Sequence, residues 1–222
     1  MENKPKIAFK RTNVPNVPMG KVYIASMNLR GTWAPKPSAS IKVVNVTSAQ
    51  ASASLTRRDF SPMTEIEGGY NGFWNFESYW QSGKVFEGIP EATTKKWWKA
   101  QNTAKRRYPG SKGKKVLYSS WPTHGNKHMD WVTSRKEVYV PEYFELMKDT
   151  ESAIELQKYV ASGKDIIIYD FDGPRLADGS VTTVELTPEL LQEKINALDF
   201  PFGHGYIVGA WLKRITPDQY IM

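Results

Sequence analysis

A short apolar run late in the chain constrains the fold more than any other segment. Residues Asp165–Phe171 read DIIIYDF, with GK before the run and DGP after it. Branched apolar side chains bounded by turn-forming residues predict a short buried β-strand. A further strand is predicted at Ile41–Thr47, which is also rich in residues branched at Cβ, and shorter strand-like pieces lie at Lys6–Lys10 and Lys21–Ser26.

Helical patterns account for much of the remaining sequence. Helices are predicted at Ile89–Tyr108, His128–Tyr139, Glu142–Met147, Thr150–Ala161 and from Thr187 onward. Pro109 and Pro141 are expected to end the first two, since proline interrupts a helix. The closing segment GYIVGAWLKRI fits either a strand or a helix. We therefore predict an α+β fold. A helix-dominated single domain with a small β-sheet would cover residues 56–222, and residues 1–55 would form a β-rich N-terminal extension or small β subdomain.

The composition excludes several classes of protein. The chain has no cysteine, which excludes a disulfide scaffold, a thiol nucleophile and a Cys-ligated zinc. His124 and His128 are close in sequence, but no third ligand is obvious nearby, so neither a metal site nor a cofactor is expected. No segment approaches the roughly 20 apolar residues of a membrane span, and the amino terminus lacks the apolar stretch of a signal peptide. A soluble cytoplasmic protein is expected.

Residues 76–86 combine two patterns with helical spacing. An apolar stripe consists of Phe76, Tyr79, Gly83 and Phe86. Glu77, Gln81 and Lys84 share a second face, because each residue advances a helix by about 100°. A helix that is buried along one side and shows this polar row along another fits the wall of a pocket. It fits an ordinary charged surface row equally well, so the spacing leaves both interpretations open.

Two carboxylates follow the predicted strand at Asp165–Phe171. Asp170 and Asp172 are separated by one residue at its carboxyl end. Such a pair commonly binds a divalent metal or ribose hydroxyls, or acts as acid and base. An Asx turn that closes a strand produces the same pattern. We favour the functional interpretation.

A glycine-rich segment, PFGHGYIVG, spans Pro201–Gly209. Its glycines would let backbone N–H groups approach a phosphate. The segment does not follow a strand and open a helix in the sequence pattern, so it is not a dinucleotide-binding fingerprint. His204 within it is interpreted as a residue that orients or contacts the substrate.

Residues 95–115 form a basic run without a single acid. Its cations are Lys95, Lys96, Lys99, Lys105, Arg106, Arg107, Lys112, Lys114 and Lys115, and Trp97, Trp98 and Tyr108 lie among them. The whole chain has a net charge of +7, so the rest of the molecule is slightly negative. Cations interleaved with flat aromatic rings suit a nucleic acid or nucleotide, although a solvated lysine-rich face is the simpler alternative.

Several blocks together resemble the NADAR family. They are FSPM (Phe60–Met63), IEGGYNGFWNFESYWQSGKVF (Ile66–Phe86), AKRRYPGSK (Ala104–Lys112), MDWVTSRKEVY (Met129–Tyr139) and FGHGYIVGAWL (Phe202–Leu212). The most specific is NFESYWQSGKVF, which is similar to the S-x-E-H-Y-F-Q-x-x-K-F helix of that family. The chain departs from the pattern at Ser78, where the family has His, and in a shortened glycine-rich end. The first 50 or so residues have no counterpart.

The resemblance implies an N-glycosidase that acts on phosphorylated riboflavin precursors or on ADP-ribose attached to guanine in nucleic acid. Lys84 would open the ribose and trap its aldehyde carbon as a Schiff base, while Glu77 moves protons. Asp170 and Asp172 would hold ribose hydroxyls or activate water. The implied substrate-binding residues are Trp80, Gln81, Trp131, Arg135, Gly203, His204 and Gly205. Of these, Trp131 would stack on the base or adenine, and the two glycines would receive the pyrophosphate.

The basic run favours nucleic acid among these substrates, because a small metabolite does not need nine cations. Removal of ADP-ribose from bases, with guanine in DNA as first choice, would suit a bacteriophage or bacterial defence against toxins that modify guanine. Two alternatives stay open. One is the same chemistry on a soluble nucleotide, an NAD-derived metabolite or a riboflavin-pathway metabolite. The other is a non-enzymatic nucleic-acid- or ADP-ribose-binding module in which Glu77 and Lys84 form an ion pair.

Overall fold

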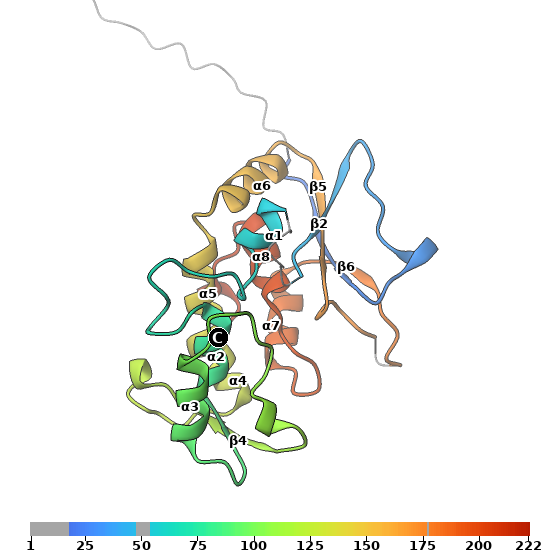
Figure 1. Cartoon of the computed structure of the whole chain (residues 1–222). Coiled ribbons are helices and arrows are strands. Elements are labelled where there is room, and N and C mark those ends of the chain that lie inside the picture. The colour runs from blue at the N-terminus through green and yellow to red at the C-terminus, as the bar shows by residue number, and fades with distance from the viewer. Residues whose placement is uncertain (1–17, 48–53, 177) are drawn as a thin grey trace, which may run out of the picture.

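A computed structural model describes residues 18–47, 54–176 and 178–222 of the chain. A four-stranded sheet and a two-stranded sheet lie toward opposite ends of a helical body (Figure 1). The α+β fold predicted from the sequence is confirmed. The strand expected at residues 6–10 lies outside the described residues. Within the described ranges, no helix is both long and apolar enough to cross a bilayer.

The predicted buried strand is confirmed as β5 (Asp165–Asp170), an inner strand of the larger sheet. It runs parallel to β1 (Val22–Ser26) and to β2 (Ile41–Asn45), which flank it. The edge strand β6 (Thr183–Glu185) pairs antiparallel with β1, so the strand order is β2-β5-β1-β6. Successive β5 side chains alternate between buried and half-buried, because neighbouring residues of a strand point to opposite faces.

The first strands of the chain belong to the same sheet as β5. Both β1 and β2 lie within residues 1–55 and are hydrogen-bonded to β5 along their length. The boundary predicted at residue 55 therefore crosses a continuous sheet and does not coincide with a gap between two β structures. The sheet forms only when β1 and β2 pair with β5, which lies more than 100 residues later in the chain, and no local sequence pattern signals that pairing.

The helices fill the space between the two sheets. Their bounds are α1 (Leu55–Asp59), α2 (Phe76–Ser82), α3 (Glu91–Lys99), α4 (Trp131–Ser134), α5 (Val140–Met147), α6 (Glu151–Ala161), α7 (Pro188–Asn196) and α8 (His204–Leu212), and the small sheet consists of β3 (Lys84–Phe86) and β4 (Val116–Ser119). The ambiguous closing segment is the helix α8. It is apolar on every side because it packs against β1 and β5 and also against α5, α6 and α7.

One helix runs from α4 to α5 through a π-helical turn at Arg135–Tyr139. The predicted end at Pro141 is therefore wrong. Proline lacks an N–H donor and its ring crowds the preceding turn, but a widened turn directly before it relieves that crowding. The π-helical turn also rotates Arg135 and Tyr139 relative to a regular helix, and both side chains line the candidate site described below.

Two predicted helices are shorter than the sequence pattern suggested. The helix predicted at Ile89–Tyr108 is α3, which stops at Lys99, because the rest of the basic run is a loop with one short turn at Pro109–Ser111. The helix predicted over residues 76–86 is α2, which stops at Ser82, so Lys84 is the first residue of β3. The carbonyl of Gly83 accepts a hydrogen bond from the Ser120 N–H at 2.8 Å, which directs the chain into the small sheet.

Gly83 occupies a position where no larger residue fits. A Cβ placed there would lie 2.0 Å from the Cε2 atom of Trp121, which is fully buried. We expect Gly83→Ala to reduce the free energy of unfolding by about 2–3 kcal/mol, since a packed indole must move. Urea unfolding measures this. The control Gly113→Ala, where a Cβ meets nothing and only the positive φ of 73° is unfavourable, should cost about 1 kcal/mol. Equal losses in both variants would contradict the steric explanation.

Candidate functional site

A cavity of about 230 Å³ lies where α2, the start of β3, the π-helical turn and the segments after β5 and before α8 converge. Its lining residues are Glu77, Trp80, Gln81, Lys84, Trp131, Arg135, Tyr139, Asp172, Pro201, Phe202 and Gly203. The structure thus brings together eight residues that the sequence analysis proposed for catalysis or substrate binding. They come from segments up to 126 residues apart, so their assembly is a property of the tertiary structure.

Glu77 lies in the first turn of α2. The side chain of Asn75 caps this helix by accepting a hydrogen bond from the Ser78 N–H at 2.8 Å, which fixes the direction of the first turn. The Gln81 amide donates to Glu77 Oε1 at 2.8 Å. Burial raises the pKa of the Glu77 carboxyl, and the bond from Gln81 and the charge of Lys84 oppose that rise. A carboxyl group in this environment can hold a proton that it would lose in water.

Lys84 presents its amine to aromatic faces. Its Nζ lies 5.1 Å from the ring centroid of Trp131 and 5.9 Å from that of Trp80. Burial lowers the pKa of Lys84, while the negative charge of Glu77 opposes the change and the nearby guanidinium of Arg135 adds to it. A larger fraction of this amine is therefore neutral at physiological pH than in an exposed lysine. A neutral amine is a nucleophile, whereas an ammonium group is not.

Asp172 lies on the opposite wall, two residues beyond the end of β5. Burial, and to a smaller extent the charge of Asp170, raise the pKa of Asp172 to about 6. The positive charges of His204 and Arg135 act against this rise. The cavity therefore combines an amine whose pKa is lowered with two carboxyl groups whose pKa values are raised. Groups with such displaced pKa values are concentrated at functional sites.

Arg135 holds the far wall of the cavity in place. Its guanidinium is buried and donates to the carbonyl oxygens of Ala197 at 2.7 Å and Phe200 at 2.8 Å, beyond the end of α7. The same group lies 4.6 Å from the ring centroid of Trp131. The guanidinium of Arg135 thus donates its hydrogen bonds to backbone carbonyl groups. It is a positioning residue that orients Trp131 and the segment leading to Gly203.

Three predicted site residues lie behind the cavity wall. Asp170 is buried and accepts hydrogen bonds from the N–H groups of Phe171 at 2.8 Å and Gly205 at 3.1 Å. His204 is buried too, and its Nε2 is hydrogen-bonded to the Val46 carbonyl. None of the three lines the cavity, so the structure does not group them with the residues around Lys84. Their assignment to substrate chemistry and binding stays a prediction from the sequence. The bond between Gly205 and Asp170 joins the start of α8 to the end of β5, and the bond between His204 and Val46 joins it to the residue after β2.

The glycines before and within α8 serve this junction. A Cβ at Gly203 would lie 2.7 Å from Asp172 Oδ2, and one at Gly205 would lie 2.7 Å from Asp170 Oδ2. Both glycines therefore allow the carboxylates to approach the amino end of α8, where the helix dipole favours negative charge. Gly203 still lines the cavity, but the N–H of Gly205 is already used by Asp170.

Tyr139, Pro201 and Phe202 line the cavity and were missed by the sequence analysis. The ring of Tyr139 lies 4.9 Å from that of Trp80, and burial raises the pKa of its hydroxyl. The helical pattern of residues 128–139 could not identify this tyrosine, because the π-helical turn changes which side chains share a face. Pro201 and Phe202 flank the glycine-rich segment, and their proximity to Gly203 was the only available signal.

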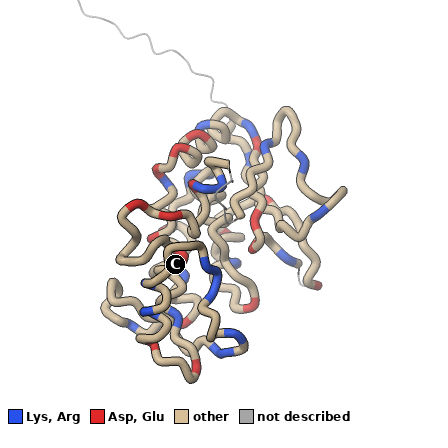
Figure 2. The backbone as a smooth tube through the Cα atoms, viewed as in Figure 1, with Lys and Arg blue, Asp and Glu red and all other residues tan. Residues whose placement is uncertain are grey.

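The basic run divides into two groups. Lys95 is paired with Glu91 and belongs with Lys96 and Lys99 on α3, whereas the remaining cations lie in the following loop, which Figure 2 shows in blue between α3 and β4. All of the loop cations are exposed. The guanidinium carbon of Arg106 lies 5.8 Å from the ring of Phe171, next to Asp172, so this loop reaches the neighbourhood of the cavity.

The aromatic residues of the run do not share one environment. Trp98 is 1% exposed, so its predicted contact with nucleic acid is wrong. It anchors α3 in the core, as an apolar side chain on the inner face of an amphipathic helix does. Trp97 is half-buried between Trp98 and Tyr108, with ring centroids 4.7 Å and 5.4 Å away.

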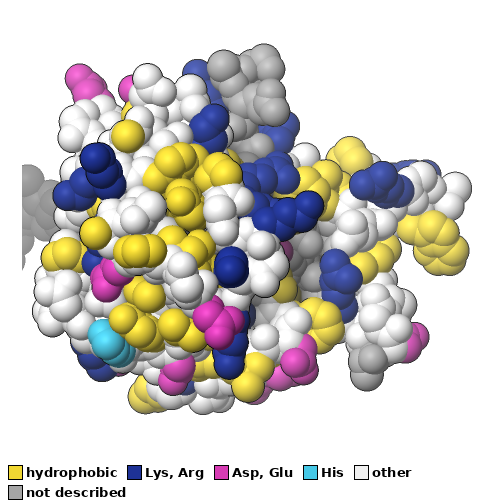
Figure 3. All heavy atoms as spheres, turned by 60° about the horizontal axis from the view of Figure 1, so that its bottom comes forward, with side chains coloured by type: hydrophobic (Ala, Val, Ile, Leu, Met, Phe, Trp, Pro, Cys, Tyr) yellow, Lys and Arg dark blue, Asp and Glu magenta, His cyan; other side chains and the backbone are white. Residues whose placement is uncertain are grey.

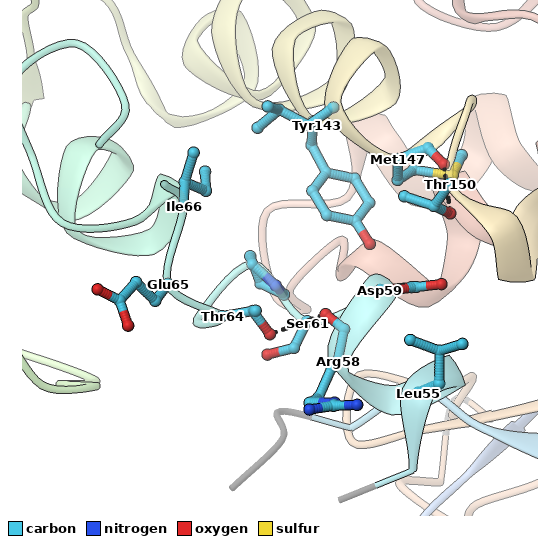
Figure 4. Close-up of a pocket in the computed structure, with 12 residues that line it drawn as sticks. Leu55, Arg58, Asp59, Ser61, Thr64, Glu65, Ile66, Tyr143, Met147 and Thr150 are labelled. Carbon is cyan, nitrogen blue, oxygen red and sulfur yellow. Dashed lines mark hydrogen bonds between the residues drawn. The ribbon is translucent and has the colours of Figure 1, made fainter. Parts of the chain in front are cut away.

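A larger cavity lies elsewhere and contains none of the predicted residues. It measures about 470 Å³ and is formed by α1, the segment after it and α5. Figure 4 shows Asp59, Ser61 and Tyr143 around it. Among the described residues, no three His, Cys, Asp or Glu side chains are arranged to hold a metal ion. Displaced pKa values together with converging polar groups, and not size, distinguish the cavity around Lys84.

The raised pKa of Asp172 predicts that the native carboxylate is unfavourable above that pKa. The folded-state pKa of about 6 exceeds the unfolded value near 3.8, so the charge reduces stability as pH rises through this interval. Asp172→Asn should therefore raise the free energy of unfolding at pH 8 by about 1–3 kcal/mol. The gain should disappear well below the unfolded pKa of 3.8, where the carboxyl is protonated in both states. Urea unfolding at the two pH values tests this, and a gain that is independent of pH would contradict it.

Comparisons of the chain with protein-family models, with curated proteins and with solved structures found no match. The resemblance to the NADAR family therefore stays a prediction from the sequence blocks.

Proposed function

We propose that the chain is an N-glycosidase that removes ADP-ribose from nucleic-acid bases, with guanine in DNA as the leading candidate. One observation carries the proposal. The amine of Lys84, with its lowered pKa, shares a cavity with the carboxyl groups of Glu77 and Asp172, whose pKa values are raised. This combination provides a nucleophile, a proton donor and a second acid–base group within one small space.

In the first stage, the nitrogen of Lys84 would replace the base at C1″ of the ribose. The neutral amine of Lys84 attacks C1″ of the ribose, and the electron pair of the bond between C1″ and the ring oxygen moves to that oxygen. Glu77, protonated at the start, supplies the proton that the ring oxygen takes up. The nitrogen of Lys84 is cationic after the attack and gives one proton to the base. The base then leaves with the electron pair of its bond to C1″, and C1″ remains joined to Lys84 as a protonated Schiff base. Division into two steps avoids expulsion of the base in a single difficult step.

The second stage would release ADP-ribose by hydrolysis. Asp172 as the carboxylate accepts a proton from water, which adds to C1″ of the Schiff base. Asp172 gives its proton to the nitrogen of Lys84, which leaves as the neutral amine, and the new hydroxyl group on C1″ gives its proton to Glu77 as the aldehyde forms. The ribose then closes when its own hydroxyl group adds to the aldehyde. Overall, one water molecule is consumed and the free base and ADP-ribose are formed. Trp131 would stack against the departing base, since its half-buried ring borders the cavity.

The size of the cavity supports a substrate that extends beyond it. Its volume of about 230 Å³ lies below the roughly 300–1,000 Å³ that enclose whole drug-sized ligands. A pentose at the reacting centre fits, whereas the base and diphosphate would extend outside. Arg106 and its exposed neighbours Lys105 and Arg107 lie on the loop that approaches Phe171 near this cavity. This arrangement supports a polyanionic strand more than a small metabolite.

The proposal predicts a specific loss of activity. Lys84→Ala should reduce release of ADP-ribose from an ADP-ribosylated oligonucleotide about 1,000-fold or more, because the nucleophile is removed. Glu77→Gln should reduce it about 100-fold, because proton transfer to the ring oxygen is lost. Chromatographic measurement of free ADP-ribose provides the rates.

The exposed Lys158 on α6 offers a matched control, and Lys158→Ala should retain the parental rate. Borohydride reduction during turnover should attach the sugar to the peptide that contains Lys84. Parental rates in both Lys84→Ala and Glu77→Gln, in correctly folded protein, would refute this site. Turnover without a trapped adduct would refute the Schiff-base step alone.

The exposed loop predicts how DNA binding depends on salt. Replacing Lys105, Arg106 and Arg107 with Ser should reduce the slope of log affinity against log salt by about 2, because up to three phosphate contacts are lost. The same charge change at Lys36, Lys158 and Lys164, which are also exposed, should leave the slope unchanged. Fluorescence anisotropy with a labelled oligonucleotide measures both. The absence of measurable affinity at low salt would favour a soluble nucleotide as the substrate.

A further inference from the structure

A second cavity lies on the other side of α2 from the candidate active site. It measures about 490 Å³ and is formed by α3, the turn that precedes Phe73 and the turn after Trp121. Its lining includes Phe73, Tyr79 and Trp121 at the base and Lys95, Lys96 and Lys99 at the rim. Figure 3 looks toward this end of the molecule and shows hydrophobic side chains gathered there, with Lys and Arg side chains beside them.

Two tryptophans separate this cavity from the site around Lys84. Trp80 lines one cavity and Trp121 lines the other, and their rings stack with centroids 5.1 Å apart and an interplanar angle of 13°. Both rings are almost fully buried. A ligand in one cavity therefore cannot be the same chemical group that occupies the other.

The rim carries positive charge that the protein does not neutralise. Lys95 is paired with Glu91, but Lys96 and Lys99 have no acidic partner within ion-pair distance among the described residues. The amine of Lys99 lies 5.8 Å from the ring centroid of Phe73. Two exposed cations above an apolar space favour a ligand that is anionic at one end and flat and apolar at the other.

The base of the cavity has few hydrogen-bonding groups to offer. The Tyr79 hydroxyl is hydrogen-bonded to Thr123 Oγ1 at 2.7 Å and donates to Glu142 Oε1 at 3.0 Å. The lip is a tight turn in which Asn71 and Gly72 both have positive φ, at 50° and 80°, as two-residue hairpin turns require. The site is thus preformed and selects for a π-face and a charge, with little readout of ring substituents.

We propose that this cavity binds a nucleotide unit, with the base against its apolar wall and the phosphate on Lys96 and Lys99. The volume of about 490 Å³ suits a mononucleotide, since small-ligand pockets measure roughly 300–1,000 Å³. Stacking of a base in such a space tolerates any base. The site lies apart from the glycosidase chemistry proposed above and does not depend on it. The nucleotide is either free or a neighbouring residue of a bound strand.

Calorimetric titration of the full chain with AMP, with an oligothymidylate of about ten residues and with decanoate tests the proposal. Lys96→Ser/Lys99→Ser should weaken AMP binding about tenfold. The control Lys158→Ser/Lys164→Ser removes the same charge from exposed positions outside the cavity and outside the basic run, and it should leave AMP binding unchanged. Ala92→Phe, at an exposed position of α3 that lines the cavity, fills the space while every charge is kept, and it should abolish AMP binding.

The outcomes separate the sources of the nucleotide. Loss of AMP binding with unchanged oligothymidylate binding identifies a free nucleotide, and loss of both identifies a unit of a strand. Parental affinity of Ala92→Phe for AMP overturns the proposal, as does an equal loss in the two lysine pairs. Binding of decanoate with no AMP binding overturns it as well, because the pocket would then accept an aliphatic chain. Circular dichroism confirms that each variant is folded.

Discussion

The stacked pair of Trp80 and Trp121 is the contact on which the arrangement of α2, β3 and the two cavities beside them depends. The indole N–H of Trp121 donates to the Tyr79 carbonyl at 3.0 Å, and its ring takes the space that a side chain at residue 83 would need. The helix α2 therefore stops at Ser82, and Lys84 enters β3. One packing interaction thus sets the end of a helix, the start of a strand and the wall between two cavities. A buried stack of two large rings is well suited to this, since it removes a large apolar area from water and has a defined geometry.

The site around Lys84 concentrates groups whose charged forms are unfavourable where they lie. Burial lowers the pKa of Lys84 and raises those of Glu77 and Asp172, so the charged form of each group is less favourable in the folded chain than in water. Such a cluster reduces stability unless other interactions offset it. The surroundings provide them: the Gln81 amide bonded to Glu77, the aromatic faces beside the Lys84 amine, and the clamp from Arg135 to the backbone after α7. An arrangement that is unfavourable for folding and well suited to proton transfer is characteristic of a catalytic site.

The sequence analysis named many residues that line this cavity, but it assigned to the substrate several residues that hold the surrounding backbone in place. The reasons can be identified. The spacing of Glu77, Gln81 and Lys84 fitted either a pocket wall or a charged surface row, and the structure places all three in one cavity. Lys84 reaches this cavity from a strand and not from the helix face that the spacing assumed. Asp172 lines the cavity, whereas Asp170 accepts a hydrogen bond at the amino end of α8. Strand alternation would put residues two apart on the same face, but β5 ends at Asp170, so Asp172 lies in the following turn and that rule no longer applies to it. The glycines of the Pro201–Gly209 segment were interpreted as phosphate-binding, yet they allow two carboxylates to approach a helix. Close approach by a ligand and close approach by a neighbouring side chain require the same residue.

The sequence by itself determined the local elements: the apolar run that becomes β5, the cap at Thr187 that begins α7, and the concentration of charge in residues 95–115. These follow from side-chain shape, capping and composition, which act over a few residues. Only the tertiary structure decided that β1 and β2 join β5 and that α4 and α5 form one helix with a π-helical turn. It also decided that the lysines of α3 line one cavity while the loop after α3 brings Arg106 to Phe171. Those outcomes depend on which distant surfaces bury each other, because contacts between segments far apart in the chain leave no periodic pattern within either segment.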